Sequence, residues 1–144
     1  GMRLISVVLG TDSVRTRTAE SRKLLNYGFR AYETHAVYRA GEQLMVSRLW
    51  QGVKEELRLG TSRDIYLTIP RGSKDKLDAL MQVDEVILAP VNKGDERGRL
   101  RVSLDGDLLV DEPLVALDGA EAAGFWSRLW DSIVLFFTQL FGSA

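Results

Sequence analysis

A chain of 144 residues is long enough for one domain with a hydrophobic core, and its formal net charge of −1 provides no strong attraction to nucleic acid. It has no cysteine, which excludes disulfides, a thiolate nucleophile and a cysteine-ligated metal. Its only histidine is His35, so a histidine-rich metal site is excluded too, and we expect no cofactor and no nucleic-acid partner.

The first expected elements are a strand and a helix. Residues 4–9 are apolar on both faces, which predicts a strand in the middle of a covered sheet. This run is too short for a signal peptide and has no small-residue cleavage site. A helix is expected over residues 16–32, with Gly28 weakening its last turn. Because one strand and one helix cannot form a covered sheet, the strand is predicted to lack neighbours.

Short strands follow from about Val37. The candidates are residues 36–38, 44–50, 55–59, 65–69, 85–89, 100–104 and 108–110. Their close spacing, with turn residues between them, predicts a small antiparallel β-sandwich. Asp105-Gly106 is a strong hairpin signal, because this dipeptide suits a turn with positive φ.

The chain ends in an aromatic-rich segment, residues 125–141, that predicts an amphipathic helix. Polar side chains occupy one face, where only Leu135 breaks the pattern. The segment is too short and too polar on one side to cross a bilayer. The residues predicted to associate with a membrane fill the other face: Phe125, Trp126, Leu129, Trp130, Ile133, Phe136, Phe137, Leu140 and Phe141.

Three surfaces could cover this helix: lipid, a second copy of the chain, or the β-rich core if the helix folds back. Burial of each large apolar side chain is worth roughly 1.5–3 kcal/mol, so exposure of the whole face to water is unfavourable. A terminal helix of this kind suits a membrane interface or a docking site. Arg128 and Asp131 are its only charges, so membrane binding should rest on apolar insertion and depend weakly on salt.

The predicted fold is mainly β and has three parts. Residues 1–35 form a strand-helix remnant, residues 36–118 a sandwich-like β-rich accessory domain, and residues 119–144 an amphipathic, membrane-associating helix. Because the strand at residues 4–9 has an open edge and two apolar faces, we expect the chain to self-associate through this strand, the terminal helix, or both.

Several motifs resemble those of low-molecular-mass penicillin-binding proteins, the serine-type D-alanyl-D-alanine carboxypeptidases of bacterial cell-wall metabolism. The motifs similar to the end of the family's catalytic domain are MRLISVVLG, Arg17, Ala19-Glu20-Ser21, Leu24-Leu25 and Tyr27-Gly28-Phe29. Those similar to its C-terminal domain are Gly52, Pro70 with Gly72, Ala89-Pro90-Val91, Lys93-Gly94, Gly98 with Leu100, and residues 113–117. The resemblance covers essentially the whole chain, in family order.

The resemblance implies that the family's S-x-x-K, S-x-N and K-T-G motifs lie upstream of this chain. We therefore expect a non-catalytic C-terminal fragment, with Gly1 as a tag remnant. Such a region would hold a catalytic domain off the periplasmic face of the bacterial cytoplasmic membrane, towards peptidoglycan, with other envelope proteins as candidate partners. The alternative is part of an active carboxypeptidase whose catalytic portion lies upstream or on another chain.

Three short patterns could carry chemistry, and each has a simpler structural interpretation. Residues 73–76, SKDK, match S-x-x-K in letters, but they follow a Pro-Arg-Gly turn, which favours Ser73 as a helix N-cap. Lys93-Gly94 is followed by Asp95, not threonine-glycine, which favours a hairpin turn. His35, close to Glu33, stands at a helix-to-strand junction, where a histidine is more often structural than a general base.

Basic residues are frequent around the first helix, and Glu20 and Glu33 partly balance them. A solvated helix face is the expected interpretation. The basic residues are Arg15, Arg17, Arg22, Lys23 and Arg30.

Overall fold

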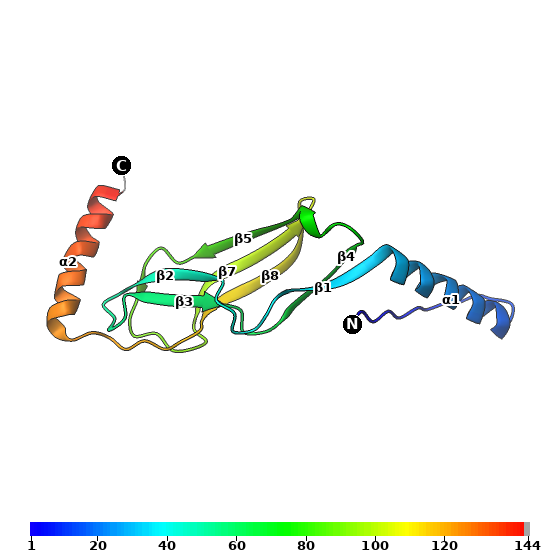
Figure 1. Cartoon of the computed structure of the whole chain (residues 1–144), viewed down its shortest axis with the longest axis horizontal. Coiled ribbons are helices and arrows are strands. Elements are labelled where there is room, and N and C mark those ends of the chain that lie inside the picture. Colours follow the sequence, from blue (N-terminus) through cyan, green and yellow to red (C-terminus); the bar gives the residue numbers. More distant parts are fainter. Residues whose placement is uncertain (143–144) are drawn as a thin grey trace.

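The computed structural model describes residues 1–142 and has a β-rich body with a long helix at each end (Figure 1). This arrangement confirms the mainly β fold with helices on both sides. In chain order the elements are α1 (Val14–Ala31), β1 (Tyr32–Tyr38), β2 (Met45–Trp50), β3 (Glu56–Gly60), β4 (Ile65–Pro70), the short 3₁₀ turn η1 (Lys74–Lys76), β5 (Leu77–Val83), β6 (Ile87–Leu88), β7 (Glu96–Leu104), β8 (Asp107–Ala116) and α2 (Phe125–Gly142).

The strands form two sheets. β1 and β4 pair antiparallel in a two-stranded sheet, and the other six strands follow the order β5-β7-β8-β3-β2-β6. The short β2–β6 pair is parallel, and the other pairs of this sheet are antiparallel. The larger sheet is therefore mixed, whereas the sequence predicted antiparallel pairing only.

Two apolar clusters hold the body together. Leu67 and Ile69 of β4 pack with Leu100 and Val102 of β7 and with Leu114 of β8, so the small sheet lies over one face of the larger one. The second cluster fills the end formed by β2, β3, β6 and the chain around them. Buried and exposed residues alternate along β4, as expected for a strand with one face on a core. These two packed layers agree with the predicted sandwich-like arrangement.

The β7–β8 hairpin forms where the sequence predicts it. Asp105 and Gly106 have φ angles of 50° and 88°, and Leu104 lies opposite Asp107. Two consecutive residues with positive φ are typical of the two-residue turn whose twist matches the flanking strands. The turn therefore sets the register of the residues next to it, and register shifts follow between Val102 and Ser103 and between Glu96 and Gly98.

β5 was not expected from the sequence. It pairs with β7 along its length, from Leu77 opposite Leu104 to Val83 opposite Gly98. As the edge strand of the larger sheet, it has only exposed and half-buried side chains, so its apolar alternation is weak. The strand expected at residues 85–89 is reduced to β6.

The N-terminal segment does not form the predicted strand. Residues 1–9 pair with no described strand and run alongside α1 (Figure 1). Leu4 packs against the backbone of Gly28, where an added Cβ would lie 2.5 Å from Leu4 Cδ1. Ile5, Val7 and Leu9 stay 77%, 75% and 85% exposed. A strand needs neighbours for its backbone groups, and within residues 1–142 the body supplies none here.

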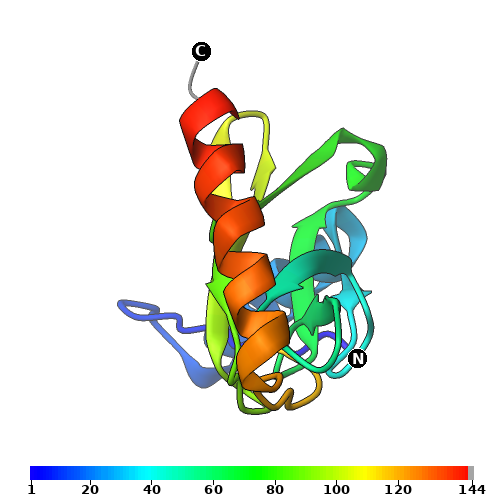
Figure 2. The same cartoon turned by 90° about the vertical axis from the view of Figure 1, so that its left-hand side faces the viewer.

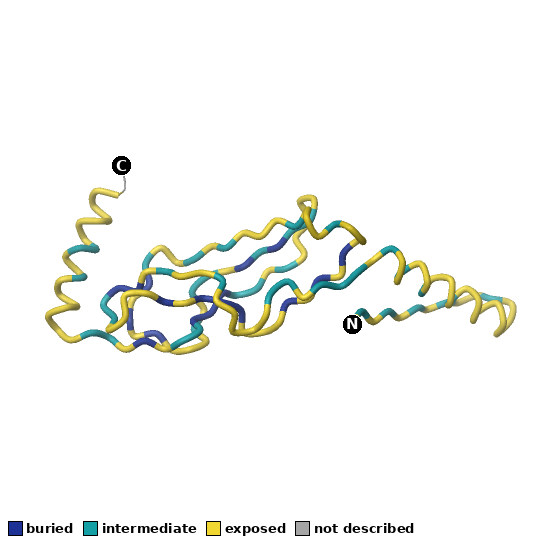
Figure 3. Tube along the Cα trace, viewed as in Figure 1, coloured by how far each residue is buried: buried dark blue, intermediate teal, exposed yellow. Residues whose placement is uncertain are grey.

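The two helices lie at opposite ends of the molecule (Figure 1). α2 runs across the long axis at its end of the body, and Figure 2 shows it in front of the sheets. Buried residues are concentrated in the body, while the helices are mostly exposed (Figure 3). The predicted division into three parts remains a prediction, and its boundary between residues 35 and 36 falls inside β1.

Candidate membrane-binding surface

α2 carries an apolar face that the described part of the chain leaves uncovered. All nine predicted membrane-associating residues lie on this helix, and their exposure ranges from 43% at Leu129 and Ile133 to 79% at Trp126. The Phe137 and Phe141 rings stack on each other, with centroids 6.1 Å apart. The helix therefore does not fold its apolar face back over the core. We name these nine residues the apolar face.

The opposite side of α2 touches the body through polar groups. The backbone N–H of Gln51, just after β2, donates to Asp131 Oδ2 at 2.8 Å. The Gln51 side-chain amide donates to Ser132 Oγ at 2.7 Å, and that hydroxyl donates to the Arg128 carbonyl at 2.8 Å. We call Gln51, Asp131 and Ser132 the latch.

Leu135, which broke the polar pattern in the sequence, belongs to this contact side. It is half-buried and, with Thr138 and Gln139, lines a shallow hollow that also includes Trp50 and Glu85 of the body. Its position explains why an apolar residue stands on the polar face. No local pattern in the sequence pointed to Gln51, because the latch joins residues about 80 positions apart.

The linker to α2 is itself bonded to the body. Val53 N donates to the Glu121 carbonyl at 3.0 Å, and Ala123 N donates to the Gln51 carbonyl at 2.8 Å. Gly124 alone separates Ala123 from the first residue of α2. The helix therefore begins directly at the body and not on a long flexible tether.

The electrostatics of α2 follow from two charges. Arg128 is exposed, whereas Asp131 is half-buried and accepts a hydrogen bond from the Gln51 backbone N–H. The helix thus presents no basic stripe towards a membrane. Within residues 1–142, no helix is long and apolar enough to span a bilayer.

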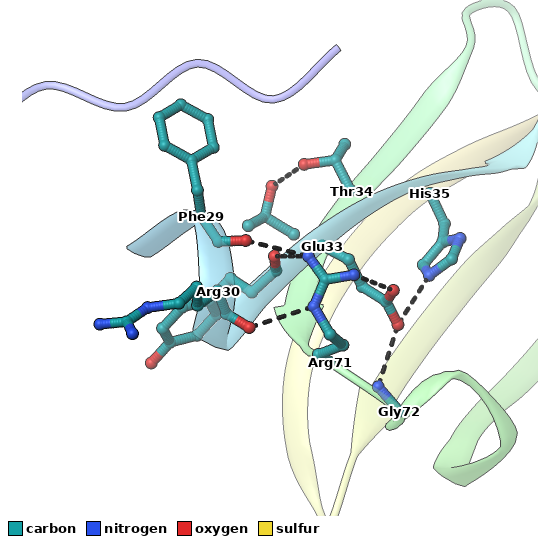
Figure 4. Close-up of polar contacts among 9 residues, drawn as sticks. Phe29, Arg30, Glu33, Thr34, His35, Arg71 and Gly72 are labelled. Atoms are coloured by element: carbon teal, nitrogen blue, oxygen red, sulfur yellow. Dashed lines mark hydrogen bonds and ion pairs between the residues drawn. The ribbon is translucent and has the colours of Figure 1, made fainter. Parts of the chain in front are cut away.

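At the other end of the body, Arg71 caps α1 (Figure 4). Its guanidinium donates to the carbonyls of Phe29 at 2.9 Å, Arg30 at 3.1 Å and Tyr32 at 3.3 Å. Its backbone N–H donates to the Ala31 carbonyl at 2.8 Å. The last carbonyls of a helix have no partner within the helix, so this single residue, just after β4, satisfies the end of α1 and joins it to the body.

Glu33 completes this junction. Gly72 N–H donates to Glu33 Oε1 at 3.0 Å, His35 Nε2 lies 3.1 Å from the same oxygen, and Arg71 Nη1 lies 3.6 Å from Oε2. The Gly72 N–H, and after it His35, hold the pKa of Glu33 below its ordinary value of 4.5, against a smaller opposing effect of burial. His35 thus has a structural environment, as the sequence suggested.

The remaining sequence candidates lie in turns or on exposed surface. Ser73 precedes η1 at the N-cap position, but its side chain makes no capping hydrogen bond, and Lys76 is exposed. Gly94 has a φ of 92° in the turn before β7. The basic residues of α1 are exposed. Among residues 1–142, no group of three or more His, Asp or Glu side chains is placed to hold a metal ion.

The β-rich body matches a known protein family. The model of the penicillin-binding protein 5 C-terminal domain matches residues 32–122, from the start of β1 to the linker before α2. The chain belongs to this family. This match confirms the resemblance inferred from the motifs. The matched residues include every strand of this chain, from β1 to β8.

Two D-alanyl-D-alanine carboxypeptidases are similar to nearly the whole chain. The chain is 40% identical to D-alanyl-D-alanine carboxypeptidase DacC of Escherichia coli over 99% of its own length. It is 36% identical to DacA of Haemophilus influenzae over 97% of its own length. Each match covers 36% of the relative. A crystal structure of penicillin-binding protein 5 from Haemophilus influenzae has a TM-score of 0.72 at 30% identity, covering 79% of this chain and 33% of that chain. The chain thus spans about a third of these relatives.

Proposed function

We propose that α2 anchors this chain at a membrane interface and that the body acts as a stalk, a spacer between the membrane and the rest of a carboxypeptidase. The observation that carries the proposal is the one-sided contact of α2. Its polar side bonds to Gln51, while the whole apolar face stays at the surface. A helix with aromatic residues on one side and polar residues on the other is suited to lie in the plane of a membrane interface.

The arrangement of the molecule supports the stalk role. α1 and α2 lie at opposite ends of the body (Figure 1), so a membrane bound at α2 would be remote from α1. The relatives carry the name D-alanyl-D-alanine carboxypeptidase. We infer that the whole protein removes terminal D-alanine from peptidoglycan stem peptides at the periplasmic face of the cytoplasmic membrane.

The chain described here would not carry out that chemistry itself. A serine nucleophile needs an adjacent base, and Ser73 lies in a turn before η1, where its side chain makes no capping hydrogen bond. Labelled penicillin should therefore leave Ser73 unmodified. The alternative of an active enzyme would require a catalytic portion elsewhere, with the body and α2 in the same supporting role.

The anchor proposal is tested by changing the apolar face alone. Trp126→Ser, Trp130→Ser and Phe137→Ser together should abolish co-flotation with phosphatidylethanolamine–phosphatidylglycerol vesicles. Each lost aromatic weakens partitioning by roughly tenfold or more, because its burial is worth about 1.5–3 kcal/mol.

The matched control replaces apolar residues of similar exposure on the body. Leu108 and Leu109, in the β8 end of the hairpin, are 57% and 42% exposed. Leu108→Ser with Leu109→Ser should float like the parent. Flotation of the α2 variant to the same extent as the parent would contradict the anchor role.

A second proposal concerns the chain in water without lipid. The apolar face and the exposed Ile5, Val7 and Leu9 are unfavourable in water, so we infer that copies associate to cover them. Light scattering at rising concentration should show oligomers for the parent and smaller species for the α2 variant. A strictly monomeric parent would contradict self-association and leave the anchor proposal standing.

A further inference from the structure

The side of α2 that touches the body decides which way its apolar face points. Asp131, Leu135 and Thr138 recur at spacings of four and three residues, so they form one stripe along the helix. Asp131 meets the backbone of Gln51, and the other two line the hollow beside Trp50. The apolar face consequently points away from the body.

This direction has a consequence for posture on a membrane. α2 crosses the long axis of the molecule at its end (Figures 1 and 2). A bilayer that receives a face pointing away from the body must lie across that end, with the long axis standing out of the membrane. Rotation of α2 about its own axis would instead bring the flank of the body onto the lipid.

Little besides the latch opposes such a rotation. No side chain of α2 is fully buried, so apolar packing on the body is limited. The linker is bonded to the body as far as Ala123, whereas the Gly124 carbonyl accepts from Arg128 N at 3.1 Å and from Ser127 Oγ at 3.3 Å, both in α2. An added Cβ at Gly124 would meet nothing within 4 Å. Gly124 thus marks the point where bonds to the body give way to bonds within α2, and a rotation of the helix would turn there. The latch lies beyond it.

Gln51 is held in position for this contact. Its φ of 58° lies in the left-handed region, which is unfavourable for a residue other than glycine. That conformation places its N–H and side-chain amide on α2, while its carbonyl accepts from Ala123. One residue thus bonds both the linker and the helix.

We propose that Gln51, Asp131 and Ser132 are positioning residues that lock α2 about its axis and so make the body stand upright on the membrane. This inference rests on the anchor role proposed above. Without the latch the helix still inserts, because the apolar face is unchanged, but the body tilts freely. Loss of the charge-assisted bond to Asp131 should raise the population of released helix roughly tenfold or more.

The latch can be tested first in lipid-free buffer, with the concentration kept low. The chain has no cysteine, so spin labels at Asp107→Cys and Leu140→Cys report one distance between the hairpin and α2. We expect a narrow distribution in the parent and a broad one after Asp131→Ala with Ser132→Ala. Thr18→Ala in α1 is the control, because its hydroxyl likewise donates to a carbonyl one turn earlier, that of Val14, and lies at the other end of the molecule. Equal widths in the parent and the latch variant would overturn the proposal.

The posture is tested on vesicles with a donor dye at Arg17→Cys, at the far end in α1, and an acceptor dye on the lipid headgroups. Energy transfer should be low for the parent and Thr18→Ala and clearly higher for the latch variant, with equal flotation of all three. Equal transfer with normal flotation would overturn the latch. Absence of flotation in all three would instead overturn the anchor role.

Discussion

At the scale of single residues, Arg71 joins two parts of the chain that are far apart in sequence. Three carbonyls near the end of α1 accept from its guanidinium, and a fourth accepts from its backbone N–H. The sequence placed residues 70–72 in a turn, which is correct, but no local pattern indicates that a turn residue caps a helix some 40 positions earlier.

Arg71→Ala should release the end of α1 without unfolding the body. We expect a loss of about 1–2 kcal/mol in the local opening free energy, because three hydrogen bonds from a charged but half-exposed group disappear. Hydrogen exchange of the amides at residues 27–32 measures this loss. Arg71→Lys keeps the charge without the planar fork and should recover only part of the protection. Unchanged exchange in Arg71→Ala would contradict the capping role.

Glu33 predicts a pH-dependent contribution at the same junction. Folding lowers its pKa below 4.5, so the ionised carboxylate stabilises the folded chain above that pH, and the contribution is lost as the pH falls through the lowered pKa. Glu33→Gln does not titrate but keeps an oxygen for the Gly72 N–H. The difference in Tm between parent and variant should therefore be largest near neutral pH and shrink below 4.5. A difference independent of pH would contradict this assignment.

At the scale of elements, the sequence predicted the turns and helices whose formation depends on neighbouring residues. The Asp105-Gly106 turn and the helix α2 were predicted correctly, because φ preferences and hydrophobic periodicity are properties of short segments. β5 was missed because an edge strand with no fully buried side chain has weak alternation. The parallel pairing of β2 with β6 depends on contacts distant in sequence, which no local pattern encodes.

Two features differ from expectation because of their surroundings: the segment at residues 4–9 and Leu135 in α2. Residues 4–9 have strand-like composition, but they lie along α1 since no neighbouring strand is present among residues 1–142. Leu135 looked like an error in an amphipathic pattern, and the structure shows that it faces the body. The apolar face of the candidate site was thus predictable from sequence, whereas the latch that orients it was not.

At the scale of the whole molecule, the two ends of the body are built differently. Arg71 and Glu33 fix α1 at one end through backbone groups, and the latch fixes α2 at the other. The core clusters between them contain no residue of either helix. A substitution in either helix should therefore leave the body folded. The effect of such a substitution on membrane binding can then be measured without a change in the stability of the body.

The central claim, that α2 is a membrane anchor, is tested most directly by vesicle flotation of the full chain and of a chain ending at Ala123. The account predicts that the full chain floats, nearly independently of salt because α2 has only two charges. The shortened chain should stay in the dense fraction while keeping the circular dichroism of its sheets. Equal flotation of the two chains would contradict the account.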